Sequence, residues 1–200
     1  MNIHKLFFYI RCIRLVPHLL AFLFGRRIVM LDMQAWEESI SNNPYRHGSV
    51  MSYCWLLDNL LEYRSLLYYR FGSFGKLLNL FAPSMPTCFL TEILSKNIGK
   101  GMVIHHGHSM RLGAAMVGEN LHIWHNVTIG KSKPGGCFPR IGNNVKIYAG
   151  AAVLGDITIG DNVVIAACSV VLKSVPSGCV VAGNPARIVK RNNQKCNESL

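Results

Sequence analysis

Aliphatic residues recur at every sixth position along the C-terminal half of this chain, and this period constrains the fold more than any other feature. The in-phase residues are Val117, Ile123, Ile129, Ile141, Ile147, Val153, Ile159, Ile165 and Val171. Ile98, Ile104 and Met110 keep the same spacing one residue out of step. Repetition at a fixed period indicates a solenoid. Period six fits neither an α-helix nor a hairpin meander, and it predicts short strands joined by tight turns.

Turn-forming residues follow most of these aliphatics, as in Ile141-Gly-Asn-Asn and Ile159-Gly-Asp-Asn. Glycine and asparagine tolerate the positive φ that a tight turn demands. Three strands and three turns would complete a coil of about 18 residues, and successive coils would stack roughly 4.8 Å apart. The sequence therefore predicts a parallel β-helix with the aliphatics inside.

The chain divides into three parts. Residues 1–90 are predicted to be a helical domain, with breaks near Pro44, Gly72 and Gly75 and a proline-containing linker at its end. Residues 91–190 are predicted to form the β-helix, and residues 191–200 a loose polar tail.

Composition restricts the classes of partner. The 21 Lys+Arg outnumber the 10 Asp+Glu, which gives a net charge of +11 and favours polyanions. No nucleic-acid-binding motif is present, so a nucleic-acid partner is not expected. The seven cysteines are scattered singly without a C-x-x-C pair, which indicates reduced thiols and a cytoplasmic location.

The first thirty residues are apolar but interrupted by Arg11 and Arg14. Their longest uncharged run is too short to span a bilayer. On a helical wheel His4, Arg11, Arg14 and His18 form one stripe against phenylalanine, isoleucine and leucine, and Pro17 is expected to divide the helix. Two interpretations remain open: packing against the rest of the protein, and peripheral contact of residues 1–30 with an anionic membrane, which would be the inner membrane surface.

Several segments resemble the hexapeptide-repeat acyltransferases, which are left-handed β-helices. They are Ile98-Gly-Lys-Gly-Met-Val-Ile-His-His-Gly107, Ile123-Trp-His-Asn-Val-Thr-Ile-Gly130, Ala167-Cys-Ser-Val-Val-Leu-Lys173 and Gly183-Asn-Pro-Ala-Arg-Ile-Val189. The likeness is strongest to serine acetyltransferases and to O-acetyltransferases of capsule and exopolysaccharide synthesis; Glu62-Tyr-Arg-Ser-Leu-Leu-Tyr-Tyr-Arg-Phe-Gly72 resembles the capsule type. The resemblance implies a left-handed parallel β-helix with an N-terminal α-helical domain, an acetyl-CoA-dependent O-acetyltransferase and a homotrimer with active sites between subunits.

By the same resemblance, His106 occupies the place of the catalytic base, which takes the proton of the acceptor hydroxyl. Stacking of the coils should put His125 directly above His106. His105 stands where serine acetyltransferases carry an aspartate that contacts the substrate, and His108 completes the expected acceptor site. In the family, an aspartate is expected to orient the base. Its position in this sequence is occupied by Thr91, and Glu92 is one residue away.

The acceptor is predicted from the insertion Lys131–Arg140, which resembles the loop that walls the family's active site. Serine acetyltransferases hold the serine carboxylate with an Arg-His pair there, and this chain has Cys137 and Phe138 instead, with Arg140 close by. The main prediction is therefore a sugar hydroxyl of a capsule, exopolysaccharide or related glycan, with Phe138 or Trp124 stacking on the ring. L-serine is the alternative.

The resemblance also places the cofactor. The pantetheine arm of acetyl-CoA should lie against two small residues, Ala149 and Ala167, and its phosphates against Lys173, Arg187 and Lys131. No metal is expected. The histidine cluster nevertheless leaves a second alternative, a zinc-dependent β-helix protein of the carbonic-anhydrase type.

Overall fold

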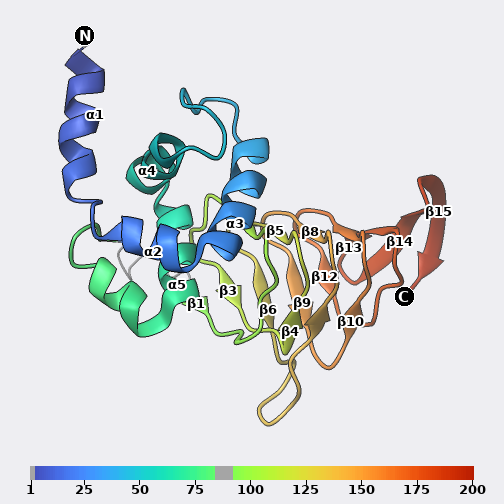
Figure 1. Cartoon of the computed structure of the whole chain (residues 1–200). Coiled ribbons are helices and arrows are strands. Elements are labelled where there is room, and N and C mark those ends of the chain that lie inside the picture. The colour runs from blue at the N-terminus through green and yellow to red at the C-terminus, as the bar shows by residue number, and fades with distance from the viewer. Residues whose placement is uncertain (1–2, 84–91) are drawn as a thin grey trace. The chain divides into compact units, whose positions relative to one another are not determined.

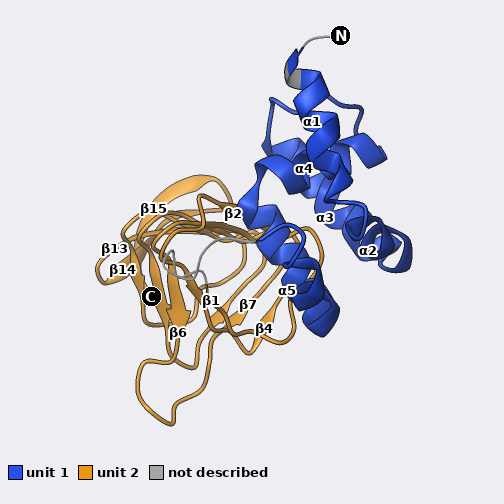
Figure 2. Ribbon diagram, turned by 90° about the vertical axis from the view of Figure 1, so that its left-hand side faces the viewer, with its two compact units in different colours: residues 1–86 blue, residues 87–200 orange. Residues whose placement is uncertain are grey.

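The computed structural model describes residues 3–83 and 92–200 and divides into two compact units, residues 1–86 and 87–200 (Figure 2). Their helices and strands are shown in Figure 1. The first unit contains helices, and the second is built from short strands. Each unit has its own buried core.

The described helices of the first unit are α1 (Ile3–Ile13), α2 (His18–Phe24), α3 (Arg26–Ser39), α4 (Val50–Asn59) and α5 (Leu61–Leu78). Pro17 precedes α2, so the predicted division of the N-terminal helix is confirmed. Leu60 takes an extended backbone and separates α4 from α5, a break that the apolar pattern did not reveal. Gly72 interrupts α5 with φ +53°, whereas Gly75 is helical. A Cβ at Gly75 would meet the backbone of Tyr68, so close packing explains this glycine.

The strands of the second unit form three walls around a narrow interior. They are β1 (Glu92–Ile93), β2 (Val103–His105), β3 (Arg111–Leu112), β4 (Met116–Val117), β5 (His122–Trp124), β6 (Thr128–Gly130), β7 (Arg140–Ile141), β8 (Lys146–Ile147), β9 (Ala152–Leu154), β10 (Thr158–Ile159), β11 (Val164–Ile165), β12 (Val170–Val171), β13 (Cys179–Gly183), β14 (Ala186–Arg191) and β15 (Gln194–Ser199). The walls are the sheets β1-β3-β6-β9-β12, β4-β7-β10 and β2-β5-β8-β11-β13-β14-β15. Pairing is parallel except where β13, β14 and β15 pair antiparallel at the C-terminal end.

The buried aliphatics stack in register from coil to coil. In the wall that contains β2, the column is Ile104, Ile123, Ile147, Ile165 and Val181, each residue buried and paired with the next. Such stacking removes nearly all aliphatic surface from water, which stabilises the coil by roughly 2 kcal/mol for each side chain. The predicted six-residue phase is confirmed by this register.

One corner is lined by asparagines. Asn120, Asn144 and Asn162 each have φ between 53° and 57° and lie one coil apart. Their side-chain amides form a ladder, with Asn120 Nδ2 donating to Asn144 Oδ1 at 2.9 Å and Asn144 Nδ2 to Asn162 Oδ1 at 3.3 Å. The turn therefore uses both properties of asparagine, its tolerance of left-handed backbone and its hydrogen-bonding side chain.

Two expectations are corrected here. Met110 is buried but does not begin a strand; Leu112 pairs with Ile129 instead, because the turn after β2 is two residues longer than a regular hexad turn. The segment expected as a loose tail carries β15, which is hydrogen-bonded along β14. Its polar side chains suit an edge strand, where one face and one edge remain in water.

Candidate active site

His106 follows β2 directly and lies at the corner between two walls of the β-helix. Its backbone is left-handed, with φ +51°, and its side chain is exposed. A positive φ is uncommon for residues other than glycine, although asparagine, aspartate and histidine adopt it more often than the rest. The backbone amide of His108 donates to the carbonyl of His106 at 2.6 Å, and Ser109 is also left-handed. The longer turn therefore presents the His106 ring to solvent, outside the column of buried aliphatic residues.

His125 lies one coil above His106, as predicted. The pairing of Ile104 with Ile123 puts both histidines two residues beyond a matched pair, and their ring centroids are 6.4 Å apart. The Nδ1 atom of His125 is buried and has no hydrogen-bond partner among the described residues. The same register continues upward from His125 through Ala149 to Ala167. These four residues form one column at this corner, which we call the histidine corner.

His105 is packed into a stack of rings on the outer face of its wall. Its ring lies 4.0 Å from Trp124 at an interplanar angle of 13°, and Trp124 lies 4.3 Å from Tyr148. The Nε2 atom of His105 is 3.1 Å from Nδ1 of His122. Burial, followed by the nearby His122, His106 and Lys146, lowers the pKa of His105 to about 4. His105 is therefore neutral near pH 7 and cannot replace the charge of an aspartate.

This ring stack corrects the role expected for Trp124. Its two ring faces are covered by His105 from the coil below and Tyr148 from the coil above, which leaves no open face for a sugar. Phe138 is also engaged, because the Lys131 ammonium lies 4.7 Å from its ring centroid. A Cβ on Gly113 would be 3.0 Å from the Phe138 ring, so this ring packs against the coil.

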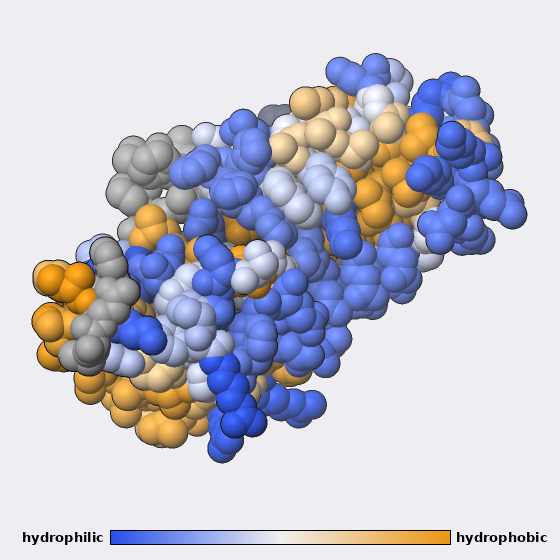
Figure 3. Space-filling view, turned by 90° about the horizontal axis from the view of Figure 1, so that it is seen from above, coloured by the Kyte–Doolittle hydropathy of each residue, from blue (hydrophilic) through white to orange (hydrophobic). Residues whose placement is uncertain are grey.

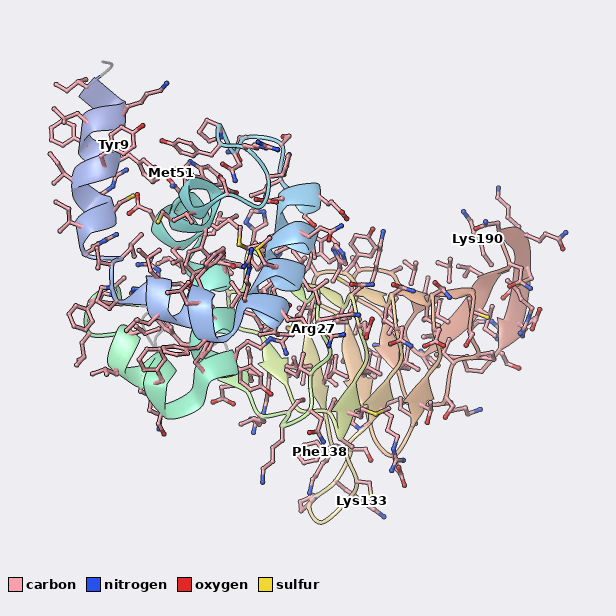
Figure 4. The ribbon with its side chains drawn as sticks, in the orientation of Figure 1. Tyr9, Arg27, Met51, Lys133, Phe138 and Lys190 are labelled. Atoms are coloured by element: carbon pink, nitrogen blue, oxygen red, sulfur yellow. The ribbon has the colours of Figure 1, made fainter. Side chains whose placement is uncertain are left out.

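The predicted acceptor loop lies at a different corner from His106. It joins β6 to β7 and projects from the unit in Figures 1 and 2, and Figure 4 labels Phe138 and Lys133 on it. Arg140 is exposed at the start of β7. The register of β6, β9 and β12 puts Lys131 and Lys173 at this same corner, two coils apart. We call it the loop corner.

Arg187 lies on β14, opposite Ala182, on the wall that carries the ring stack. The column runs from His105 through Trp124, Tyr148, Ala166 and Ala182 to Arg187. Five strand steps separate His105 from Arg187, or roughly 24 Å at 4.8 Å each. The Nε of Arg187 donates to Asn197 Oδ1 at 2.9 Å, and the Lys173 ammonium donates to the Leu200 carbonyl at 2.6 Å.

The expected orienting carboxylate is not found on Glu92. Its side chain is exposed and forms an ion pair with Arg111, with Oε2 and Nε 3.5 Å apart. Thr91 lies outside the described residues. Among residues 3–83 and 92–200, no group of three or more histidine, cysteine, aspartate or glutamate side chains has a geometry that could hold a metal ion.

Comparison with known proteins identifies relatives of this arrangement. Residues 138–173 match the family model described as bacterial transferase hexapeptide (six repeats). Serine acetyltransferase of Synechococcus elongatus is 45% identical over 98 residues, covering 48% of this chain and 40% of that protein. The chain spans about half the length of the curated relatives it matches, as in the 50% covered of serine acetyltransferase 2 from Arabidopsis thaliana.

Solved structures extend the likeness to most of the chain. Soybean serine acetyltransferase complexed with serine is 32% identical with a TM-score of 0.63, covering 82% of this chain and 69% of that one. Serine acetyltransferase of Brucella abortus in complex with coenzyme A is 26% identical with a TM-score of 0.62, covering 88% and 69%. These neighbours and the family model support the predicted left-handed β-helix with its N-terminal helices.

Proposed function

Because this chain belongs to the hexapeptide-repeat transferases and is related to serine acetyltransferases, we propose that it transfers an acetyl group from acetyl-CoA to an acceptor hydroxyl. The observation that carries the proposal is the exposed ring of His106 on a left-handed turn, beside His125 and at the foot of a column of small residues. An exposed imidazole at a corner can meet two substrates that approach from outside the coil.

His106 is the general base of the proposed reaction. Its ring nitrogen takes the proton of the acceptor hydroxyl as the oxygen attacks the thioester carbonyl of acetyl-CoA. The tetrahedral intermediate then collapses with cleavage of the C–S bond. The departing sulfur receives the proton from His106, so the products are the acetyl ester and coenzyme A, and the histidine returns to its neutral form.

The cofactor lies along the histidine corner in this proposal. Ala149 and Ala167 leave room there for a thin pantetheine arm beside the backbone. Arg187 lies on the wall that borders this corner, roughly 24 Å from His105, and supplies a cation for the phosphates of an extended ligand. Coenzyme A is present in the related Brucella complex, which supports the assignment of the donor.

The two corners favour an assembly in which subunits share the site. Lys131, Phe138 and Lys173 belong to the loop corner, and His106 belongs to the histidine corner of the same coil stack. A site that uses both sets needs the loop corner of a second copy against the histidine corner of the first. A closed homotrimer would contain three such sites, because each subunit contributes its histidine corner to one site and its loop corner to the next.

For the acceptor, the relatives support L-serine better than the sugar predicted from the loop sequence. The ring stack weakens the sugar prediction as well, because Trp124 has no free face. Arg140, exposed beside the loop, is the proposed partner of the serine carboxylate. A sugar remains the second candidate on one observation: His105 is neutral where an anion would meet the serine ammonium.

Release of free thiol from acetyl-CoA tests the proposal, with L-serine and a panel of sugars and glycans as acceptors. Serine turnover with a Michaelis constant at or below about 1 mM, the upper end of the usual enzyme range, would support the amino-acid acceptor. Turnover only with sugars would restore the second candidate. Absence of acetyl-CoA binding by calorimetry would refute acetyl transfer itself.

A further inference from the structure

The first two helices expose an unusual amount of apolar surface. Ten of the 18 exposed large hydrophobic side chains in the described residues fall within this short segment: Ile3, Leu6, Phe7, Tyr9, Ile10, Ile13, Val16, Leu20, Leu23 and Phe24. We call them the apolar face. Figure 3 shows apolar surface at its left-hand end, where α1 lies in Figure 1, and Figure 4 labels Tyr9 on α1. Surfaces of this kind mark interaction sites.

Three polar side chains attach this segment to the rest of the unit. Arg11 Nε and Arg14 Nη2 each lie 2.8 Å from a carboxylate oxygen of Asp58, whose side chain is only 3% exposed. His18 is fully buried, and its Nε2 lies 2.8 Å from the Tyr68 hydroxyl. Arg11 and Arg14 remain 50% and 41% exposed, so these contacts hold the flank of the segment and leave its apolar face in solvent.

Only one side of α1 packs against the rest of the helical unit. Phe8 is buried and Cys12 half-buried, four residues apart on the inward side. Ile3, Phe7 and Ile10 lie on the opposite side at helical spacing and are each more than half exposed. Packing within the unit therefore uses one narrow strip of α1, and most of its apolar side chains have no role in the core.

The charges carried by residues 1–31 are all positive. Lys5, Arg26 and Arg27 are exposed, and the sequence contains no aspartate or glutamate before Asp32. Asp58 can neutralise only one of its two arginine partners, so a further unit of charge remains at Arg11 and Arg14. An apolar face on a segment whose charges are all cations is the composition of helices that lie in the interface of an anionic membrane.

We propose that α1 and α2 dock this protein on an anionic lipid surface, with the apolar face in the headgroup region and the cations on lipid phosphates. No single helix in the described ranges is long and apolar enough to cross a bilayer; the pair Lys5–Ile13 and His18–Phe24 is bent by 76°.

Co-sedimentation with vesicles tests this docking. The whole protein should bind phosphatidylglycerol–phosphatidylcholine vesicles, bind pure phosphatidylcholine at least tenfold more weakly, and lose binding as salt is raised. Phe7→Glu with Ile10→Glu should reduce the partition coefficient at least tenfold without changing the melting temperature. Leu172→Glu is the matched control, because Leu172 is 51% exposed and Ile10 is 52% exposed; it should bind as the unmodified protein does.

A second set of variants separates charge from apolar insertion. Arg26→Gln with Arg27→Gln should weaken binding to anionic vesicles and leave the residual binding to neutral vesicles unchanged. Equal binding of both vesicle types, or no binding to either, would overturn the proposal. A different result would also overturn it: the Phe7→Glu, Ile10→Glu protein has a lower molar mass by sedimentation but unchanged vesicle binding. That result would mean that a second copy of the chain covers the apolar face.

Discussion

The ring centroids of His106 and His125 lie 6.4 Å apart at an interplanar angle of 62°, in successive coils of the β-helix. Strand register alone produces this pairing, because each histidine stands two residues beyond one of a matched pair of buried isoleucines. The two rings differ in their surroundings. His106 is exposed on a left-handed turn, whereas His125 is half-buried. His106 is the more accessible of the two, which is why we propose it as the base.

Replacement of His106 tests its assignment as the base. His106→Ala should lower the turnover number roughly 100- to 10,000-fold, the usual loss for a missing general base. The exposed side chain contributes little to the core, so melting temperature and molar mass should not change. Steady-state thiol release measures the effect. A variant with more than a third of the original activity would disprove the assignment.

The hexad phase predicts where a charge cannot be tolerated. Ile147→Asp should prevent folding, since it buries an unpaired carboxylate in the centre of the column. Lys146→Asp is the control, because Lys146 is the preceding residue and points outward. Circular dichroism melting compares the two variants. A normally folded Ile147→Asp protein would show that the column does not need an apolar residue at this position.

Arg187 is expected to act on acetyl-CoA binding and not on the chemical step. Arg187→Ala should raise the Michaelis constant for acetyl-CoA roughly tenfold, the value of a lost charge-assisted hydrogen bond, with turnover nearly unchanged. Asn197→Ala removes the partner of its guanidinium and keeps the cation, so it serves as the control. A fall in turnover at constant Michaelis constant would place Arg187 outside the cofactor site.

Lys173 is expected to behave in the same way from the loop corner. Lys173→Ala should raise the Michaelis constant for acetyl-CoA, because phosphate contacts distant from the thioester bind ground and transition states alike. Its ammonium also holds the Leu200 carbonyl. Deletion of Leu200 alone should therefore leave the constant unchanged. Equal effects of the two changes would show that Lys173 anchors the terminus only.

Acid should weaken the helical unit through His18. Burial, followed by Arg64 and Arg14, lowers the pKa of His18 to about 4, below the ordinary value of 6.5. The unfolded chain therefore binds more protons than the folded one between these values, so stability falls as pH decreases from about 6.5 toward 4. The full loss is about 3 kcal/mol, of which about 2 kcal/mol occurs between pH 7.5 and 5. Urea unfolding at pH 7.5 and 5 measures it, and His18→Gln should flatten this dependence. Stability that rises on acidification would contradict the prediction.

Sequence reasoning found the features that repeat and missed those that occur once. The aliphatic column and the pairing of His106 with His125 follow from a six-residue count, because neighbouring coils share one register. The longer turn after β2 was missed, since Met110 continues the count while Leu112 forms the strand. Gly107 and Ser109, turn-forming residues between those positions, were the available signal of an irregular turn.

The amino-acid sequence by itself determined the β-helix, its three-wall repeat and the corner where His106 stands, because periodic burial of aliphatics is a local property of the chain. Tertiary structure alone decided which way the N-terminal helices face, since Asp58 pairs with Arg11 and Arg14 and Tyr68 contacts the buried His18 from distant positions. It also decided that Trp124 is enclosed between rings of two other coils. These outcomes depend on contacts between residues far apart in sequence, which no local pattern encodes.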